Sequence, residues 1–427
     1  MLRSGGAPSP IGKPPAGIAP LAPPLAAGKV FEAQSITQSR SKLWIRDIVV
    51  ACLLLALYLV LAARVSPPPD SPLSRAAKAT KAAGLPRASS KSPRAAVEAV
   101  NVQRAATQHA GQGNHSGAGL HHPERRIATV LGSFVGDAAA MGLHWIYDVN
   151  KINQLVNNGN PEFFEPPSSP FYQYESGEQS PYGYEELVLL RSAARASGVD
   201  GPTLQQDLYD GFKEYSGRLN RASKDVISNV DAGCKFPHCG SRSVDAHGLV
   251  KVAVVAALYA GSPELAEKTR DAVLAHQDNP LVLSSAIDTA RLLEHVILHG
   301  SVANALEWGL QPGHLSDGSR VLLEHAHQAR HTAHTAAVKR FGQTCELPGS
   351  YESDLHGAFT STGFADSIRK TILAGGDSCS RAVFLGAMFA AQDGLSAIPD
   401  EWKAKVARYA EIQSLVETAM SKVSKQS

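Results

Sequence analysis

Two glycine-rich segments contain the residues of this sequence that are best suited to chemistry. In the first, residues 132–145, Asp137 stands among glycines, alanines and apolar residues, and His144 follows near the end. A carboxylate among apolar neighbours is costly unless it is paired or hydrogen-bonded. Asp137 therefore either takes part in a functional site or caps a neighbouring helix, and the sequence leaves both interpretations open.

The second segment, residues 374–387, is a Gly-Gly turn followed by a run of small residues with helical character. The unpaired amide groups and the dipole at the start of such a helix favour anions. Asp377 or Ser378 can cap this helix, and Ser380 stands in its first turn. Cys379 also falls there, where a thiolate is stabilised; the alternative is a plain helix cap with a buried thiol.

Hydrophobic periodicity predicts that helices position these segments. Residues 262–273 begin with a serine cap, a proline and an acid, and residues 364–372 repeat apolar residues every four positions up to the Gly-Gly turn. A last helix is predicted over residues 402–420. No convincing series of alternating strands is present, so the sequence predicts an all-α helical bundle. Two long Pro-rich loops, 160–182 and 232–243, are candidates for carrying sites.

The chain divides into a leader and a folded part. Residues 1–41 are rich in glycine, proline and alanine, and residues 66–125 are basic with few acids, so we expect both to be disordered. Between them, residues 42–65 contain an uncharged apolar run at 48–63. We expect one hydrophobic helix there, acting as a signal-peptide core or a membrane anchor. Residues 126–423 are expected to form one helical domain.

The leader also suggests a localisation. A hydrophobic run followed by a basic, Ser-rich stretch resembles the two-part plastid leaders of some algae, and the alternative is a flexible stalk below a membrane anchor. Asn114 begins a glycosylation motif, which is used only if this side enters the secretory lumen. We expect a membrane-anchored, secretory or plastid-targeted protein whose globular domain is soluble.

Composition limits the function classes further. The 427 residues have a net charge of only +2, whereas nucleic-acid-binding proteins usually show a strong basic excess on one face. No nucleic-acid partner is therefore expected. The four cysteines of the folded part are too sparse for a disulfide scaffold, and their disulfide state is left open. These residues are Cys234, Cys239, Cys345 and Cys379.

A series of motifs in order along residues 127–423 resembles one known family. The motifs are the two glycine-rich segments, Pro170-Phe171-Tyr172, Ser180-Pro181-Tyr182-Gly183, Ala246-His247-Gly248 and the ending 394–402. With them the domain resembles the ADP-ribosylglycohydrolase fold, and more closely the branch that includes the J1-crystallins and selenoprotein J. The resemblance implies an all-α bundle with a central cleft. It also implies a small-molecule ADP-ribosyl ligand or an ADP-ribosylated protein as partner.

The same resemblance implies a metal site that this sequence largely lacks. Family members typically hold two divalent ions with a Thr-Asp-Asp motif and a late Asp-Thr-Asp-Thr motif, and these ions orient the ribose and a water. Here Ser180-Pro181-Tyr182 and Asp377-Ser378-Cys379-Ser380 stand at those motifs. Asp377 is the best remaining metal position. One carboxylate and a few hydroxyls cannot offset the charge of two magnesium ions, so magnesium is only a weak expectation and no other cofactor is indicated.

Neighbouring residues do not restore the lost ligands. His144 stands where an acidic residue often follows the early Gly-Asp motif. Glu185 and Glu186 come just after the lost pair, but helical geometry turns at least one of them away from it. Both are therefore weak substitutes.

Three hypotheses follow. The domain hydrolyses or binds ADP-ribosyl groups, it is a catalytically inactive, crystallin-like structural or ligand-binding protein, or it is a thiol-dependent enzyme. In the last case Cys379 is the nucleophile, with His144 or His247 as the base. The candidate catalytic residues are Asp377, Cys379 and His144. The candidate ligand-binding residues are Asp137, Ser180, His247, Lys251, Ser378 and Ser380. Lys251 and Arg381 either meet a phosphate or are surface charges.

Two further clusters of histidines and cysteines are candidate zinc sites. One predicted helix carries His325, His327, His331 and His334, of which the last three share a face. One loop carries Cys234, His238 and Cys239 at loose spacing. A solvated helix face is the commoner interpretation of the first cluster, and a disulfide is an alternative for the second.

Overall fold

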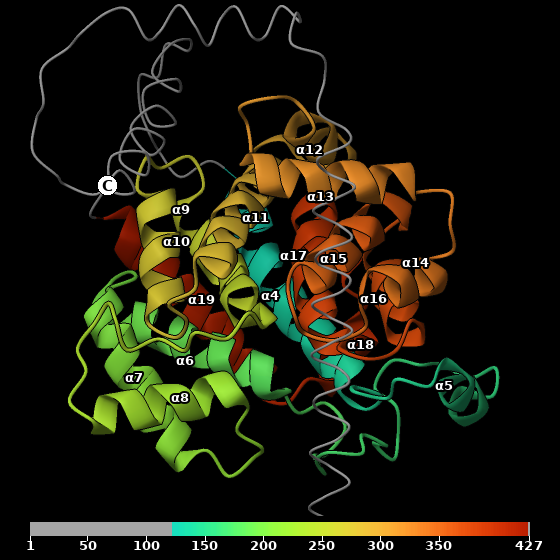
Figure 1. Ribbon diagram of the computed structural model, residues 1–427, viewed down its shortest axis with the longest axis horizontal. Coiled ribbons are helices and arrows are strands. Elements are labelled where there is room, and N and C mark those ends of the chain that lie inside the picture. Colours follow the sequence, from blue (N-terminus) through green and yellow to red (C-terminus); the bar gives the residue numbers. More distant parts are fainter. Residues whose placement is uncertain (1–121, 426–427) are drawn as a thin grey trace, which may run out of the picture. The chain divides into compact units, whose positions relative to one another are not determined.

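The computed structural model describes residues 122–425, which belong to one compact unit (Figure 1). These residues form sixteen α-helices and two 3-10 helices, without a β-strand in this range. In chain order the helices of the first part are α4 (Pro123–Met141), α5 (Val149–Val156), α6 (Pro181–Ala196), α7 (Gly201–Glu214), α8 (Arg221–Asp231), η2 (Ala246–Lys251), α9 (Val252–Tyr259) and α10 (Leu265–Leu274). Those of the second part are α11 (Pro280–His299), α12 (Val302–Gly309), α13 (Asp317–Gln328), α14 (His334–Phe341), α15 (Gly349–Thr360), α16 (Phe364–Leu373), α17 (Ser378–Asp393), η3 (Leu395–Ala397), α18 (Asp400–Lys405) and α19 (Tyr409–Ser424). The predicted all-α fold is confirmed.

Helices α4 and α17 pack directly against each other at the centre of this unit. Their facing positions are glycine and alanine, and a Cβ atom added at Gly132 would collide with the carbonyl oxygen of Gly386. A Cβ atom at Gly136 would collide in the same way with the carbonyl oxygen of Ala382. The small-residue runs of the sequence therefore allow two backbones to touch, which brings the two glycine-rich segments together.

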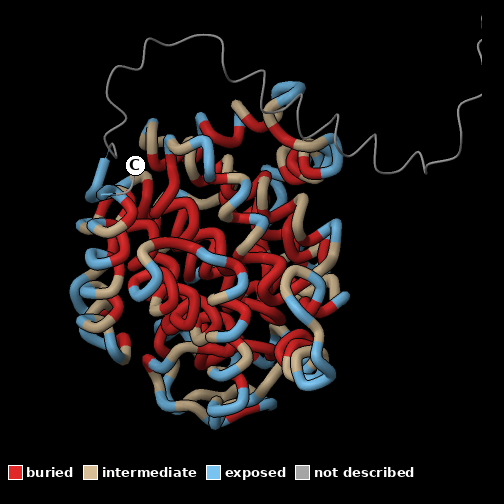
Figure 2. Tube along the Cα trace, turned by 90° about the vertical axis from the view of Figure 1, so that its left-hand side faces the viewer, coloured by how far each residue is buried: buried red, intermediate tan, exposed pale blue. Residues whose placement is uncertain are grey.

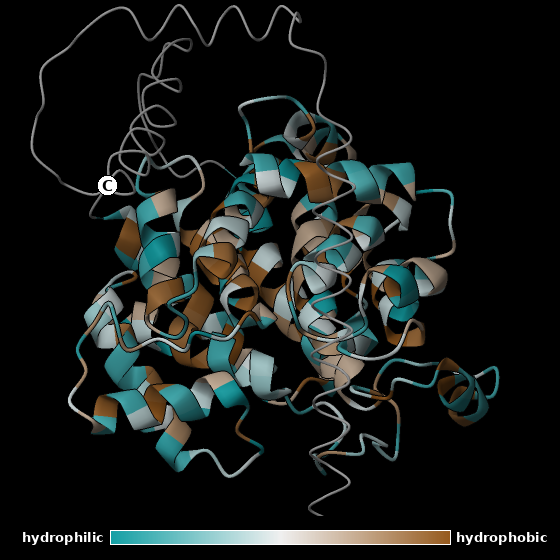
Figure 3. Cartoon of the chain, in the orientation of Figure 1, coloured by the Kyte–Doolittle hydropathy of each residue, from teal (hydrophilic) through white to brown (hydrophobic). Residues whose placement is uncertain are grey.

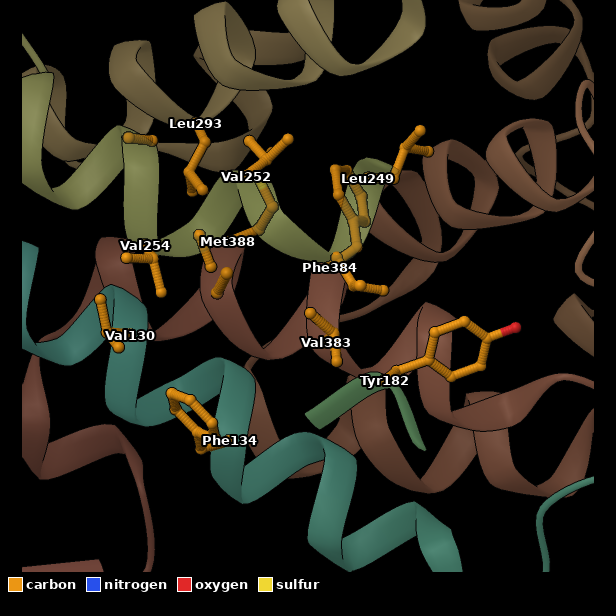
Figure 4. Packing of buried hydrophobic residues seen from close by; sticks show 14 of the residues in the cluster. Val130, Phe134, Tyr182, Leu249, Val252, Val254, Leu293, Val383, Phe384 and Met388 are labelled. Atoms are coloured by element: carbon orange, nitrogen blue, oxygen red, sulfur yellow. The ribbon is translucent and has the colours of Figure 1, made fainter. Parts of the chain in front are cut away.

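Apolar side chains from several helices fill the space beside this pair. Figure 4 shows Val130 and Phe134 of α4, Val254 of α9, and Val383 and Met388 of α17 in one packed region. All residues of α9 are buried, and buried residues fill the interior in Figure 2. The candidate site lies where the carboxyl end of α4 meets the amino end of α17.

Helices α7, α8, α13 and α14 lie at the periphery and are amphipathic. In Figure 3 they carry hydrophilic residues on their outer faces, and in α8 only Ala222, Ser223 and Val226 are buried. A single apolar stripe on an otherwise polar helix is the pattern of a surface helix. These helices close the unit around its apolar centre.

The predicted helix over residues 402–420 is two helices, α18 and α19. Between them Arg408 adopts a left-handed conformation with φ 63°, and the amide of Ala407 donates to the carbonyl oxygen of Gly177 at 2.9 Å. The prediction of one continuous helix was wrong because apolar periodicity does not reveal such a tertiary hydrogen bond. The helix predicted to end at the Gly-Gly turn is confirmed as α16.

The leader lies outside the described residues. This applies to residues 1–41, to the apolar run at 48–63 and to the basic stretch up to residue 121. Within residues 122–425, none of the helices combines the length and the apolar character that a membrane crossing requires. Disorder of the leader, membrane anchoring and organelle targeting stay predictions.

Candidate functional site

Asp377 lies at the start of α17, where the loop after α4 meets the Gly-Gly turn. The amide of Gly376 donates to the carbonyl oxygen of Ile146 at 2.7 Å, and the amide of Trp145 donates to that of Gly376 at 2.8 Å. A Cβ atom at Gly376 would collide with the carbonyl oxygen of Gln343, and its φ of 68° also favours glycine. This turn therefore fastens Trp145 and its neighbours beside Asp377.

The carboxylate of Asp377 is buried and fully engaged by protein donors. Its Oδ1 accepts from Trp145 Nε1 at 2.9 Å and from the Tyr182 hydroxyl at 3.1 Å. Its Oδ2 accepts from the hydroxyl of Ser380. His144 Nε2 lies 3.4 Å from Oδ1. Asp377 thus sits in a closed polar cluster with His144 and Ser380.

His144 and Cys379 are also neighbours, but in an arrangement that does not activate the thiol. The amide of Cys379 donates to His144 Nδ1 at 3.1 Å, so this ring nitrogen is not free to take the thiol proton. Burial raises the pKa of Cys379 well above the usual range, and its Sγ lies 3.6 Å from the carbonyl oxygen of Asp137. The expected stabilisation of a thiolate by the helix start is outweighed, because removal from water penalises the charged form.

Burial lowers the pKa of His144 to about 4, which makes a prediction about acid stability. Because the folded-state pKa lies below the unfolded value of 6.5, the neutral ring stabilises the fold above pH 6.5. That contribution is lost as the pH falls toward 4, and it amounts to about 3 kcal/mol. We expect the His144→Asn variant to lose less stability between pH 7 and pH 4 than the unchanged protein does. Urea unfolding of both proteins at the two pH values measures this difference.

A matched control is His238→Asn, because the side chain of His238 is 76% exposed. This variant should show the acid dependence of the unchanged protein. An equally steep loss of stability in His144→Asn would contradict the assignment of a neutral, buried imidazole.

Asp137 and Ser180 hold two helices together. The carboxylate of Asp137, on α4, accepts from the amide of Ser180 at 2.7 Å and from its hydroxyl at 2.5 Å. Ser180 is the N-cap of α6, since its side chain accepts from the amide of Tyr182. Burial raises the pKa of Asp137 to about 7, although the bonds from Ser180 oppose this shift. Of the two interpretations of Asp137, this geometry favours the one in which it caps a neighbouring helix.

Arg381 is buried and positions the Gly-Gly turn. Its guanidinium donates to the hydroxyl of Thr371 at 2.8 Å, to the carbonyl oxygen of Thr371 at 3.2 Å and to that of Gly375. It also interacts electrostatically with Asp377 and Asp354. Arg381 is therefore not a surface charge: it is fully buried, and its Nε and Nη2 donate to Thr371 and Gly375.

The remaining ligand-binding candidates lie in two different places. Ser378, at the start of α17, has a buried hydroxyl for which the described residues offer no partner. His247 and Lys251, on η2, lie with Glu185 and His276 in a second buried cluster. The sequence did not single out His276, and it treated Glu185 as a weak substitute. The pair Glu185–His247 joins residues 62 positions apart, so only the fold could reveal it.

Aromatic side chains cover the polar cluster of Asp377. Phe171 and Tyr172, from the first Pro-rich loop, contact the ring of Trp145 with centroids 5.5 and 5.7 Å apart. Arg218 lies over Phe171 at 5.0 Å and over Trp145 at 5.6 Å. Phe171 is 45% exposed, whereas Trp145 and Tyr172 are almost buried. The prediction that this loop contributes to the site is supported by these contacts.

The zinc hypothesis for the four histidines does not match the structure. The predicted helix carrying four histidines is interrupted, because α13 ends at Gln328 and α14 begins at His334. His334 is buried and its Nδ1 lies 3.0 Å from Nδ1 of His356, while His331 falls in the exposed link. The four described cysteines are free thiols. The group that has the geometry to hold a metal within residues 122–425 is instead Glu185, His247 and His276.

The donor set around Asp377 does not fit magnesium. This ion requires several oxygen ligands in near-octahedral geometry. Both oxygens of Asp377 already accept hydrogen bonds from Trp145, Tyr182 and Ser380, and the oxygens of Asp137 accept from Ser180. The residues around Asp377 are therefore unsuited to hold a magnesium ion.

Comparisons with known proteins agree with this fold. A profile of the ADP-ribosylglycohydrolase family matches residues 117–427. Crystallin J1A and Crystallin J1B of Tripedalia cystophora are 29% and 28% identical over 69% and 68% of this chain and 95% and 94% of their own length. An uncharacterized protein of Archaeoglobus fulgidus is 25% identical over 64% of this chain and 88% of its own length. A solved structure, described as an ADP-ribosylglycohydrolase-related protein complex, covers 71% of this chain and 99% of its own with a TM-score of 0.58 at 18% identity. The chain belongs to the ADP-ribosylglycohydrolase family.

Proposed function

We propose that this domain is a non-hydrolytic member of its family that serves as a crystallin-like structural protein. The observation that carries the proposal is the hydrogen bonding of the buried Asp377 carboxylate. Its two oxygens accept hydrogen bonds from three protein donors. Its similarity to two crystallins over 94% or more of their length supports a structural role. A structural role would explain why the domain keeps the fold of its family but not the groups needed for hydrolysis.

The residues at this site are poorly suited to hydrolysis of a glycosidic bond. Such a reaction needs a carboxylate or a metal to activate water and an acid to protonate the leaving group. Asp377, His144 and Cys379 are all completely buried. The lowered pKa of His144 and the raised pKa of Cys379 make both groups neutral near pH 7, and Trp145 and Tyr172 separate them from solvent. Water and substrate have no direct approach to these groups.

The proposal predicts no turnover of ADP-ribosylated peptides. We would incubate the full-length chain with peptides ADP-ribosylated on arginine or on serine, with and without magnesium, and measure the released ADP-ribose. The expected rate equals that of the buffer in each case. A magnesium-dependent release that disappears in Asp377→Asn would overturn the proposal, and an active hydrolase serves as the positive control.

A second candidate function is binding of an ADP-ribosyl group without hydrolysis. The specific observation is the exposed ring of Phe171 beneath the guanidinium of Arg218. A flat aromatic face beside a cation is suited to a nucleobase ring and a phosphate. Calorimetric titration with ADP-ribose tests it: binding that is indifferent to magnesium and at least tenfold weaker in Arg218→Ala would support this function. No binding in the unchanged protein would leave the structural role.

A further inference from the structure

A second cluster of charged and polar groups lies behind Tyr182. Glu185 of α6, His247 and Lys251 of η2, and His276 after α10 are all 2% exposed or less. The ring of Tyr182 stacks on that of His247 with centroids 4.9 Å apart. The cluster therefore adjoins the Asp377 site on the other side of one aromatic ring, but it shares none of its hydrogen bonds.

Three groups of this cluster have the composition and spacing of a transition-metal site. One ligand atom from each of Glu185, His247 and His276 lies within 4.8 Å of the other two. Oε2 is 3.0 Å from His247 Nδ1 and 3.4 Å from His276 Nδ1. Two imidazoles and one carboxylate are a known ligand set for zinc, and ligands about 2 Å from one ion are separated by distances of this size.

The ammonium group of Lys251 occupies the same place. Its Nζ lies 2.9 Å from His276 Nδ1, 3.4 Å from Glu185 Oε2 and 2.8 Å from the carbonyl oxygen of His247. These three acceptors match the three protons of an ammonium group. Because Lys251 can only donate, His276 accepts through Nδ1 and its own ring proton is on Nε2, 3.4 Å from the hydroxyl of Ser223.

The other carboxylate oxygen of Glu185, Oε1, has a donor of its own outside this group. The amide of Asn220 donates to Glu185 Oε1 at 2.7 Å.

We propose that Glu185, His247 and His276 form a latent binding site for a divalent transition metal, and that the ammonium group of Lys251 occupies this site as a built-in cation. With Lys251 present, the negative charge of Glu185 is balanced and a divalent ion would add two uncompensated charges in a buried place. Without Lys251, the carboxylate lacks its cation and the two imidazole rings face it. The unchanged chain is then metal-free, whereas a chain without the ammonium group binds one metal ion.

The test uses the full-length chain and its Lys251→Met variant. Because the cluster is sealed, each protein is refolded with Zn²⁺ or Co²⁺ in the buffer and then freed of loosely bound ions with a chelating resin. We expect Lys251→Met to retain one equivalent of metal, to show the intense visible absorption of four-coordinate Co²⁺, and to melt at a higher temperature with metal than without it. The unchanged chain should retain less than a tenth of an equivalent and show no shift.

The matched control is the double variant Glu185→Gln with Lys251→Met. It removes both charges, so it should fold without metal and bind Co²⁺ at least 100-fold more weakly than the single variant. Equal metal retention by the single and double variants would overturn the proposal. So would stoichiometric metal in the unchanged chain that is lost on His276→Ala, because Lys251 would then not be the cation.

Folding of the single variant is itself informative. If Lys251→Met folds only in the presence of Zn²⁺, the metal replaces the ammonium group as proposed. If it stays unfolded with Zn²⁺ while the double variant folds without it, the three groups do not form a metal site and the proposal fails.

Discussion

Replacement of Asp377 by alanine is expected to lower the free energy of unfolding by about 3–5 kcal/mol. The change leaves Trp145 Nε1, the Tyr182 hydroxyl and the Ser380 hydroxyl without their shared acceptor in a place that water does not reach. Each buried donor without a partner costs about 1–3 kcal/mol. It also removes a negative charge that interacts with the buried Arg381. Urea unfolding followed by circular dichroism measures the effect.

The matched control is Asp400→Asn, because the side chain of Asp400 is 96% exposed. Its effect should stay within about 0.5 kcal/mol. The sign of the change in stability in Asp377→Ala distinguishes a structural role of this residue from a catalytic one. Groups held for catalysis often destabilise the fold, so a variant as stable as the unchanged chain, or more stable, would favour a catalytic residue over a structural one.

Replacement of Glu185 by methionine is the second change for which we expect a large effect. It leaves the ammonium of Lys251 buried with the carbonyl oxygen of His247 and the ring of His276 as its partners. Breaking a buried ion pair by removing one partner typically costs about 3–5 kcal/mol, because an uncompensated charge is left. We expect a loss of this size in equilibrium unfolding at pH 7.

A double-mutant cycle tests the ion pair itself. Glu185→Met and Lys251→Met should each destabilise strongly, whereas the double variant should lose clearly less than the sum of the two, since it buries neither charge. Additive losses would contradict a direct interaction between Glu185 and Lys251. Lys213→Met, at a position that is about half exposed, controls for the general effect of replacing a lysine.

The class of the fold could be predicted from local features. Apolar residues at helical spacing, Pro-rich starts and glycine ends are properties of neighbouring residues, and they correctly indicated α16 and the start of α18. In the structure, the small-residue runs at 132–145 and 374–387 allow close backbone packing, because glycine and alanine leave room for it. The order of the motifs along the chain was enough to indicate the family.

The absence of the family's usual metal ligands could also be predicted from the sequence, because it depends only on which residues stand at those positions. A proline and a tyrosine at the positions of two carboxylates cannot supply the oxygen ligands of magnesium, whatever the fold. What the sequence could not show is how Tyr182 acts in their place. Its hydroxyl donates to Asp377, a residue 195 positions away, and Trp145 does so across 232 positions.

Burial also decided the chemistry of the candidate residues. Cys379 stands at a helix start, as expected, but its pKa is raised because the thiol is enclosed by α4 and α17. Glu185 points toward His247 and His276 because α6 packs beside η2. The sequence by itself determined which chemical groups are present and which helices carry them. The tertiary structure alone decided which groups meet and how far water is excluded from them, because hydrogen bonds and desolvation depend on contacts between distant parts of the chain.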